Sequence, residues 1–402
     1  MKTIKQIIEN ELCTGCGLCA SVFNDKISLN MNESGFFRPI ITDELNNIET
    51  KLFNEFCPGC GLERLNTFDE NYNIIWGNII NIRMGFSSDK NLRFKGASGG
   101  AISGFLYFLL NENIVDYVIN IKGSSKYPLM NIISVTKNYN DILETTGSRY
   151  SPSAPLRDID TYLKNDGAYA FVGKPCDVYA LKKYINTKIE YQKKIKVFIS
   201  FACAGIPSLN ATKFMLDKFD IRESEVKFIR YRGNGWPGKT VIETKSGKIY
   251  EMKYIESWGE ILGQAIQFRC KICPDGLGES ADVVFGDAWI TENGYPTFDE
   301  SDGLSLIISR SQNGENLIKR SINTKYIKLG KKIHINELDN IQPYHKKRRS
   351  SICARILAMK LLFKLVPRYR RLRILRAAFK QSFIVNFRNF IGMCIRIIFK
   401  KV

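Results

Sequence analysis

The sequence predicts a mixed α/β protein in three parts: a small cysteine-rich module, a central α/β domain, and C-terminal basic amphipathic helices. Cysteines gather near the N-terminus and again between Cys176 and Cys273. Short apolar runs alternate with amphipathic stretches through the middle of the chain, as in α/β folds. No acidic residue follows Asp339. We therefore expect boundaries at residues 1–68, 74–343 and 344–402.

The charge is unevenly distributed. The 402 residues include 59 Lys and Arg and 40 Asp and Glu, a net charge of +19. Without the 17 basic residues from Lys346 onward, the body has 42 basic and 40 acidic residues. A near-neutral body with a cationic end favours an interaction segment over a nucleic-acid-binding domain. We expect no nucleic-acid partner.

The 11 cysteines indicate metal or redox chemistry. The first ten residues contain no apolar run long enough for a secretory signal, so we expect a cytoplasmic, reducing environment. In such a compartment, clustered cysteines serve metals more often than disulfides.

The first cysteine group has the spacing of a cubane-cluster loop. Cys13, Cys16 and Cys19 form a Cys-x2-Cys-x2-Cys motif, which lets three thiolates hold one face of a 4Fe-4S cluster. Phe23 stands where bacterial ferredoxins place a fourth cysteine, and the nearest Cys-Pro pair is Cys57-Pro58. We expect Cys57 to be the fourth ligand, with Cys60 as the alternative. A zinc knuckle is the competing interpretation, although zinc seldom uses three thiolates at this spacing.

A second group predicts another four-thiolate site. Cys176 and Cys203 each follow a predicted buried strand, at 168–172 and 195–201, and Cys270 and Cys273 form a Cys-x2-Cys pair. Sites in open α/β sheets lie at the carboxyl ends of strands. The competing interpretation of Cys176 and Cys203 is that they are packing residues. Cys353 and Cys394 have no partner spacing, and we expect them to be structural.

Two glycine-containing segments are candidates for holding a cofactor. In the first, Lys95-Gly96-Ala97-Ser98-Gly99-Gly100 opens an apolar helix at 101–111, where small residues let an anion or a flat ring approach the backbone. The same pattern also suits a simple helix cap. The second, residues 228–238, could hold a flavin ring by stacking and bind its phosphates through Arg230 and Arg232. The alternative is an exposed turn between strands, followed by a hairpin around residues 245–248. The absence of Gly-x-Gly-x-x-Gly disfavours a Rossmann site.

Taken together, these motifs resemble the coenzyme F-420 hydrogenase/dehydrogenase beta-subunit family from about Cys13 to Pro343. The resemblance rests on the cysteine groups and on segments 95–100, 147–150, 173–176, 203–207, 235–236 and 286–289. It implies FAD, with FMN possible, beside a 4Fe-4S cluster held by Cys176, Cys203, Cys270 and Cys273. It also implies a ferredoxin-like N-terminal module that passes electrons inward. Expected cofactor-binding residues are Lys95, Gly96, Ser98, Gly99, Gly100, Ser148, Arg149, Tyr150, Arg230, Gly235 and Trp236.

The C-terminal segment is predicted to be helical over 351–366 and 370–401, with Pro367 between the helices. No apolar run reaches the roughly 20 residues of a spanning helix. We expect a cationic amphipathic helix on an anionic membrane surface, at the inner face of the membrane. The alternative is a helix packed on the body or on a partner subunit.

These observations lead to a hypothesis of an iron–sulfur flavoprotein oxidoreductase. Electrons from a ferredoxin would pass through two 4Fe-4S clusters to a flavin, which would reduce a small or lipid-linked substrate, such as one in surface polysaccharide biosynthesis. Lys95 and Asp287 are the expected catalytic residues. The alternatives are a deazaflavin (coenzyme F-420) oxidoreductase subunit, a non-catalytic electron-transfer subunit of a larger complex, and a zinc-stapled binding module.

Overall fold

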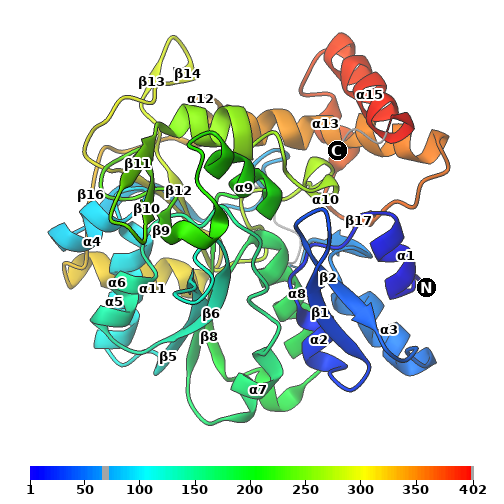
Figure 1. Ribbon diagram of the computed structural model, residues 1–402, viewed down its shortest axis with the longest axis horizontal. Coiled ribbons are helices and arrows are strands. Elements are labelled where there is room, and N and C mark those ends of the chain that lie inside the picture. Colours follow the sequence, from blue (N-terminus) through cyan, green and yellow to red (C-terminus); the bar gives the residue numbers. More distant parts are fainter. Residues whose placement is uncertain (66–71, 400–402) are drawn as a thin grey trace.

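The centre of the molecule is an eight-stranded mixed sheet (Figure 1). The computed structural model describes residues 1–65 and 72–399. Strands β12, β8, β7 and β5 run parallel, and the outer pairs are antiparallel. In sheet order the strands are β16 (Ile327–Leu329), β4 (Asn81–Ser87), β15 (Ser305–Ser309), β12 (Val283–Asp287), β8 (Ile195–Phe201), β7 (Tyr169–Val172), β5 (Tyr117–Gly123) and β6 (Asn131–Thr136). This confirms the predicted mixed α/β class.

Both faces of the sheet are buried. Side chains alternate along the strands, so that Phe171 and Val284 belong to one core cluster while Ala170 and Val283 belong to the other. One face is covered by α4 (Lys90–Lys95), α5 (Ala101–Asn111), α6 (Tyr139–Glu144) and α11 (Gln312–Asn323). The other face packs against α8 (Pro175–Ile185) and against the terminal segments.

The β7–α8–β8 unit positions two of the predicted ligands. All four residues of β7 are buried, as a central parallel strand requires. Pro175 occupies the first turn of α8, where its missing N–H costs nothing. Cys176 therefore lies in the first turn of α8, and Cys203 follows the end of β8. The predicted position at the carboxyl edge of the sheet is confirmed.

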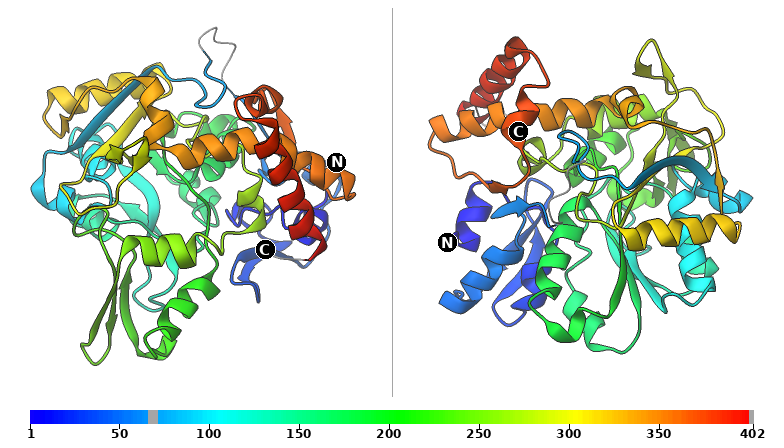
Figure 2. Two further views of the ribbon diagram at one scale, coloured as in Figure 1. Left: turned by 90° about the horizontal axis from the view of Figure 1, so that it is seen from above. Right: turned by 180° about the vertical axis from the view of Figure 1, so that it is seen from behind.

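A small lobe stands beside the main sheet (Figure 2, left). It contains a three-stranded antiparallel sheet of β9 (Val226–Arg230), β10 (Thr240–Thr244) and β11 (Ile249–Met252). Helix α9 (Leu209–Asp217) and a π-helix, Ile255–Leu262, share its hydrophobic core. The predicted hairpin around residues 245–248 is present.

The N-terminal module is built from three helices and a hairpin. Its elements are α1 (Ile4–Glu9), α2 (Leu18–Val22), β1 (Ile27–Met31), β2 (Phe37–Ile41), α3 (Asn47–Phe56) and β3 (Gly61–Glu63). Asn46 caps α3 and forms a capping box with Glu49. Strands β1 and β2 pair as an antiparallel hairpin. Helix α3 packs on α8, which joins the module to the central sheet. The expected boundary at residue 68 lies outside the described residues.

The remaining helices and strands link the strands of the main sheet or form the C-terminal segment. They are α7 (Ile159–Lys164), α10 (Phe268–Lys271), β13 (Thr291–Glu292), β14 (Tyr295–Pro296), α12 (Leu338–Ile341), α13 (Pro343–Leu361), β17 (Arg368–Arg370), α14 (Ile374–Ala378) and α15 (Phe383–Ile398). Helix α13 starts before the predicted 343/344 boundary.

The predicted continuous helix from residue 370 is wrong. Arg368–Arg370 forms strand β17 and pairs in parallel with β3. Arg371 and Arg373 then adopt left-handed conformations, with φ of 60° and 48°, which end any helix there. The interrupted chain lets Leu372 enter the core with only 3% of its surface exposed. Residue 401, the predicted end of that helix, lies outside the described residues.

Candidate iron–sulfur centres and the adjoining glycine-rich face

Four predicted ligands surround one cavity in the N-terminal module. Cys13, Cys16, Cys19 and Cys57 line it, together with apolar side chains such as Ile7. Cys19 belongs to the first turn of α2, and Cys57 follows the last residue of α3. The buried Cys60 is not among the residues that line the cavity, and its carbonyl accepts a hydrogen bond from Lys2 Nζ at 2.9 Å. The geometry favours Cys57 over Cys60.

The loop that carries these cysteines depends on Gly17. This residue has φ of +88°, and a Cβ atom there would lie 2.9 Å from the backbone of Arg157. Both facts require glycine, because a side chain would be strained and would collide with the neighbouring loop. The Cys-x2-Cys-x2-Cys loop is thereby held against the segment that leads into α7.

The second group of four cysteines is also brought together. Cys203 and Cys273 both act electrostatically on Cys176, and Cys270 and Cys273 both act on Cys203. Burial, followed by the Cys270 thiolate, raises the pKa of Cys203 to about 12, although Arg348 opposes the shift. In the first group, burial and then Asp177 raise the pKa of Cys16 to about 12.

Both donor sets fit cubane clusters. Buried thiols with raised pKa values lose their protons only to a partner that supplies positive charge, which the irons of a cluster do. In residues 1–65 and 72–399, no three Cys, His, Asp or Glu side chains converge closely enough to hold a single metal ion. Cysteines spread around a cavity suit a cluster with iron at several corners better than one zinc ion.

A thin layer of side chains separates the two groups. Asp177 is fully buried, pairs with Lys174 at 2.6 Å, and raises the pKa values of both Cys16 and Cys176. Arg269 donates a hydrogen bond to the carbonyl of Pro58 at 3.0 Å, while the thiolates of the second group help to raise its pKa. The Arg269 side chain thus contacts the backbone beside Cys57 of the first site and interacts electrostatically with the thiolates of the second.

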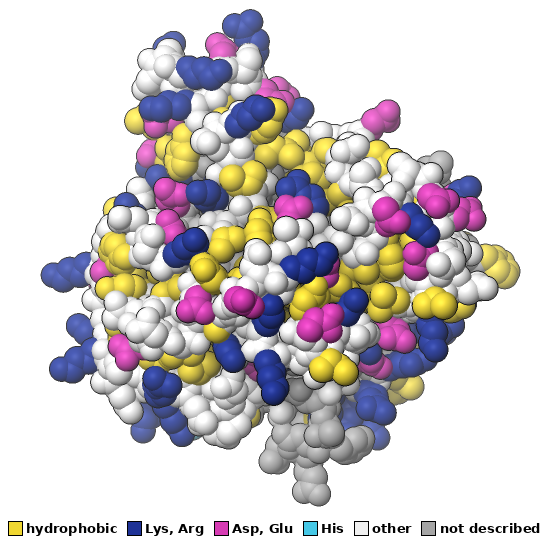
Figure 3. Space-filling view, turned by 90° about the horizontal axis from the view of Figure 1, so that it is seen from below, with side chains coloured by type: hydrophobic (Ala, Val, Ile, Leu, Met, Phe, Trp, Pro, Cys, Tyr) yellow, Lys and Arg dark blue, Asp and Glu magenta, His cyan; other side chains and the backbone are white. Residues whose placement is uncertain are grey.

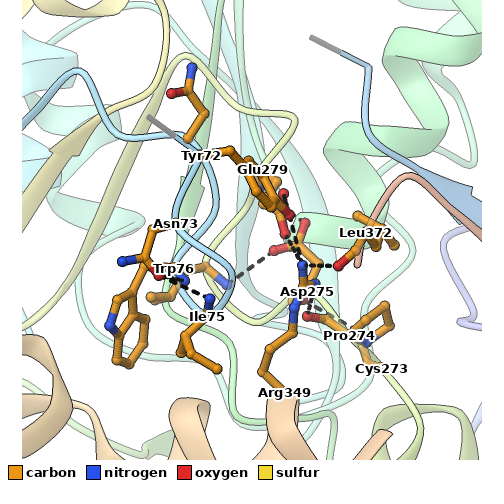
Figure 4. A network of polar contacts seen from close by, with 12 residues as sticks. Tyr72, Asn73, Ile75, Trp76, Cys273, Pro274, Asp275, Glu279, Arg349 and Leu372 are labelled. Carbon is orange, nitrogen blue, oxygen red and sulfur yellow. Dashed lines mark hydrogen bonds and ion pairs between the residues drawn. The ribbon is translucent and has the colours of Figure 1, made fainter. Parts of the chain in front are cut away.

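The C-terminal segment forms part of the second site. Arg348 Nη2 donates to the carbonyl of Cys203 at 2.8 Å, and Arg349 Nη1 donates to the carbonyl of Pro274 at 2.7 Å. Arg349 also pairs with Glu279 at 3.0 Å (Figure 4). Tyr369 completes the contact through its hydroxyl, which donates to the carbonyl of Ile272 at 2.5 Å. These cations of the predicted tail are therefore buried beside a cysteine loop and cannot serve a membrane surface.

Several predicted cofactor segments meet at a second location, around a buried ion pair. Arg232 Nη2 lies 2.8 Å from Asp287 Oδ1 and donates to the carbonyl of Ala97 at 2.6 Å. Trp236 Nε1 donates to Asp287 Oδ1 at 2.7 Å, and Ser98 Oγ donates to the carbonyl of Gly286 at 2.8 Å. We call the surroundings of this pair the glycine-rich face. It joins segments 95–100, 232–236 and 286–289.

The glycines of this face serve backbone packing. A Cβ atom on Gly233 would lie 2.5 Å from the carbonyl oxygen of Lys95, and one on Gly147 would lie 2.5 Å from that of Arg232. A Cβ atom on Gly96, Gly99 or Gly100 would likewise collide with the backbone. Trp236 stacks on Trp289, with ring centroids 5.0 Å apart. At these positions the missing side chain makes room for neighbouring backbone, and contact with a cofactor ring stays a prediction.

The other predicted residues have separate environments. Arg149 donates to Asn131 Oδ1 and to the carbonyl of Ile229, at 2.8 and 2.9 Å. The Tyr150 hydroxyl accepts from Arg232 at 3.3 Å, whereas Arg230 is half-buried at the end of β9. Lys95, Ser148 and Gly235 are half-exposed. The catalytic roles of Lys95 and Asp287 stay predictions, although both oxygens of Asp287 already accept hydrogen bonds.

Sequence reasoning missed the residues that brace the cysteines. Arg269 immediately precedes Cys270, and its position inside the motif could have identified it. Asp177 follows Cys176 directly, and its charge in the first turn of a predicted helix was a weaker signal. Arg348 and Arg349 gave no distinguishing signal, because a basic run is usually solvated.

The chain belongs to a known class of redox subunits. Residues 83–159 match the N-terminal family model of the coenzyme F-420 hydrogenase/dehydrogenase beta subunit, and residues 166–334 match its C-terminal model. Together these models cover more than half of the chain, so the chain is a member of this family. The resemblance expected from the sequence is confirmed.

Several curated relatives are named as oxidoreductases or their subunits. The chain is 26% identical to the F-420-dependent formate dehydrogenase subunit beta of Methanocaldococcus jannaschii, over 64% of this chain and 69% of the relative. It is 25% identical to the coenzyme F-420-dependent sulfite reductase of the same organism, over 86% of this chain and 50% of the relative. The coenzyme F-420 hydrogenase subunit beta of Methanothermobacter thermautotrophicus is 22% identical, over 59% and 79%.

One solved structure shares the fold. A chain of the F-420-reducing nickel–iron hydrogenase complex from Methanosarcina barkeri, in a xenon-derivatized crystal, superposes with a TM-score of 0.55. The match covers 72% of this chain and 96% of that chain, at 18% identity. These findings support an oxidoreductase with a role in electron transfer.

Proposed function

We propose that this chain is an iron–sulfur electron-transfer subunit of an oxidoreductase that exchanges electrons with coenzyme F-420. The observation that carries the proposal is the pair of adjoining four-cysteine sites. Cys13, Cys16, Cys19 and Cys57 would hold one 4Fe-4S cluster, and Cys176, Cys203, Cys270 and Cys273 would hold the other. Arg269 contacts both regions, so electrons would have a short path between them.

The names of the curated relatives support F-420 as the two-electron partner. They favour this alternative over a ferredoxin donor and a polysaccharide substrate, for which the relatives give no support. A deazaflavin exchanges a hydride, whereas each cluster carries one electron. When bound, a flavin supplies the conversion between two-electron and one-electron transfer. FAD, with FMN as the alternative, therefore stays in the proposal as an expectation.

The half-exposed residues at the border of the glycine-rich face, Lys95, Ser148 and Gly235, would contact the F-420 or flavin. The Arg232–Asp287 pair fixes the segments that border this face, and Lys95 places a half-exposed cation beside them. A cation there would attract the phosphate groups of a nucleotide or deazaflavin. A larger redox complex is the expected partner, because two of the similar proteins are named as hydrogenase or dehydrogenase subunits.

Anaerobic purification followed by iron, sulfide, zinc and flavin quantitation tests the cofactors. About eight irons per chain are expected for two clusters. Addition of F-420 with reduced viologen should then bleach the deazaflavin absorbance. The double variant Cys176→Ala/Cys203→Ala should contain about half of the iron of the parent chain. It should no longer bleach the F-420 absorbance. Zinc without iron would contradict the redox proposal, and two intact clusters that leave F-420 unchanged would contradict only the choice of coenzyme.

A further inference from the structure

The outer side of α15 is unusually apolar for a surface helix. Apart from Val385, its exposed large hydrophobic side chains recur mainly at intervals of three, four or seven residues, which places them on one side of the helix. Phe383 is 82% exposed and Phe387 is 54% exposed, whereas Met393 on the inner side is fully buried. We define the outer face of α15 as Phe383, Ile384, Phe387, Ile391, Ile395 and Ile398.

The neighbouring loops extend this surface. Phe363, which follows α13, is 98% exposed, and Phe379, which precedes α15, is 80% exposed. Helix α15 lies along α13 at the edge of the molecule, away from the β9–β11 lobe (Figures 1 and 2). Exposed large apolar side chains gathered on one helix face mark a contact with a partner or a membrane.

The charged residues of this part of the chain are all basic. No acidic residue occurs beyond Asp339, and the cations Lys364, Arg376, Lys380 and Arg388 flank or interrupt the outer face in the sequence. The face of the molecule seen from below, by contrast, carries Lys and Arg interspersed with Asp and Glu (Figure 3). An apolar helix face on a segment whose charged residues are all cations is complementary to a surface with an apolar interior and anionic groups at its boundary.

We propose that the outer face of α15 binds the interface of an anionic lipid bilayer. Phe383 and Phe387 would enter the boundary between headgroups and acyl chains, while the surrounding cations contact lipid phosphates. In the described part of the chain, no helix has the length and hydropathy needed to cross a membrane. Binding along the surface is the mode that this geometry allows, because α15 remains packed on α13 through Met393.

The bound surface would lie close to the second cysteine group. Arg355 on α13 donates to Asn389 Oδ1 on α15 at 2.9 Å and to the carbonyl of Lys271 at 2.6 Å. Lys271 stands between Cys270 and Cys273 in the sequence. The Arg355 side chain therefore connects α15 to the cysteine loop. Binding of α15 to a bilayer would hold the second cysteine group close to the membrane surface.

Co-sedimentation of the full chain with vesicles tests the proposal. Binding is expected to vesicles of equal parts phosphatidylcholine and phosphatidylglycerol, and to be much weaker with phosphatidylcholine alone. Phe383→Ser and Phe387→Ser should each weaken partitioning about tenfold, because each removes a buried aromatic contact. Lys380→Gln/Arg388→Gln should weaken it in the anionic vesicles only.

Phe214→Ser is the matched control, because Phe214 is 53% exposed on α9, outside the outer face of α15. It should leave binding unchanged, and all variants should keep the iron content of the parent chain. Equal binding by the Phe383 variant and the parent would overturn the proposal. A dimer in sedimentation velocity that Phe383→Ser abolishes, without vesicle binding by the parent, would also overturn it and assign the face to a second copy of the chain.

Discussion

Cys57 and Cys60 lie three residues apart, yet their surroundings give them different roles. Cys57 borders the cavity with Cys13, Cys16 and Cys19, whereas Cys60 is buried outside it. Cys57→Ala should therefore remove about half of the bound iron, since three thiolates hold a cubane poorly. Cys60→Ala should keep about eight irons per chain. Iron quantitation on anaerobic protein distinguishes the two, and equal loss in both variants would contradict the assignment.

Asp287 is the counter-ion of a nearly fully buried guanidinium. Arg232 has 2% of its side chain exposed and relies on Asp287 for charge compensation. Asp287→Asn should destabilise the protein by about 3 kcal/mol, because it leaves a buried charge unpaired. Anaerobic denaturant unfolding measures this loss. Asp302→Asn is the control, since Asp302 is 91% exposed and should contribute close to nothing. Similar midpoints for the two variants would refute the role of the pair.

At the scale of elements, α11 is tied to β4 by the pair Glu315–Arg83, with a separation of 2.6 Å. Burial raises the pKa of Glu315, but hydrogen bonds from Arg83 and others outweigh it and lower the pKa to about 2. A depressed carboxyl pKa stabilises the fold above the unfolded value near 4.5, and this contribution disappears as the pH falls toward about 2.

Glu315→Gln should accordingly cost about 3 kcal/mol at neutral pH and progressively less below about pH 4.5. The thermal midpoint, compared with that of the parent chain at each pH, measures the difference. Glu144→Gln removes a salt bridge in which Glu144 is 60% exposed, and it should have little effect at any pH. A constant difference down to pH 3 would contradict this linkage.

The elements of the central sheet could be predicted because their sequences are locally consistent. The buried runs of β7 and β8 carry a continuous apolar pattern, and Pro175 marks the start of α8. The C-terminal segment could not be predicted as well. Strand β17, at residues 368–370, forms because it pairs with the edge of β3, at residues 61–63, which is far away in the sequence. A three-residue strand bounded by arginines has no local signature.

At the scale of the whole molecule, the two cysteine groups adjoin each other, and the clusters proposed for them would act as one redox unit. Arg269 is a buried cation close to both, so it should raise both reduction potentials by favouring the more negative, reduced clusters. Arg269→Gln should lower the potentials by on the order of 50 mV, from Coulomb's law at an effective dielectric constant of about 20. Redox titration followed by EPR measures the shift. Arg320→Gln, on α11, should leave both potentials unchanged.

The candidate sites show the same division between local and long-range information. The eight cysteines could be selected as candidates from the spacing of two motifs and from the position of Cys176 and Cys203 after buried strands. The bracing by Arg348 and Arg349 could not be predicted, because these arginines reach loops about 145 and 75 residues away in the chain. The glycine-rich face was only partly predictable: its segments meet, but Trp236 of the predicted flavin segment stacks on Trp289.

The pairing of β3 with β17 has a consequence for biosynthesis. Gly61 bonds to a strand that begins at Arg368, so the edge of the N-terminal module stays unpaired until residues 368–370 have been synthesised. The second cysteine group likewise waits for Arg348 and Tyr369. A nascent chain stopped before β17 would therefore carry all eight candidate ligands but lack part of the protein that packs against the second group.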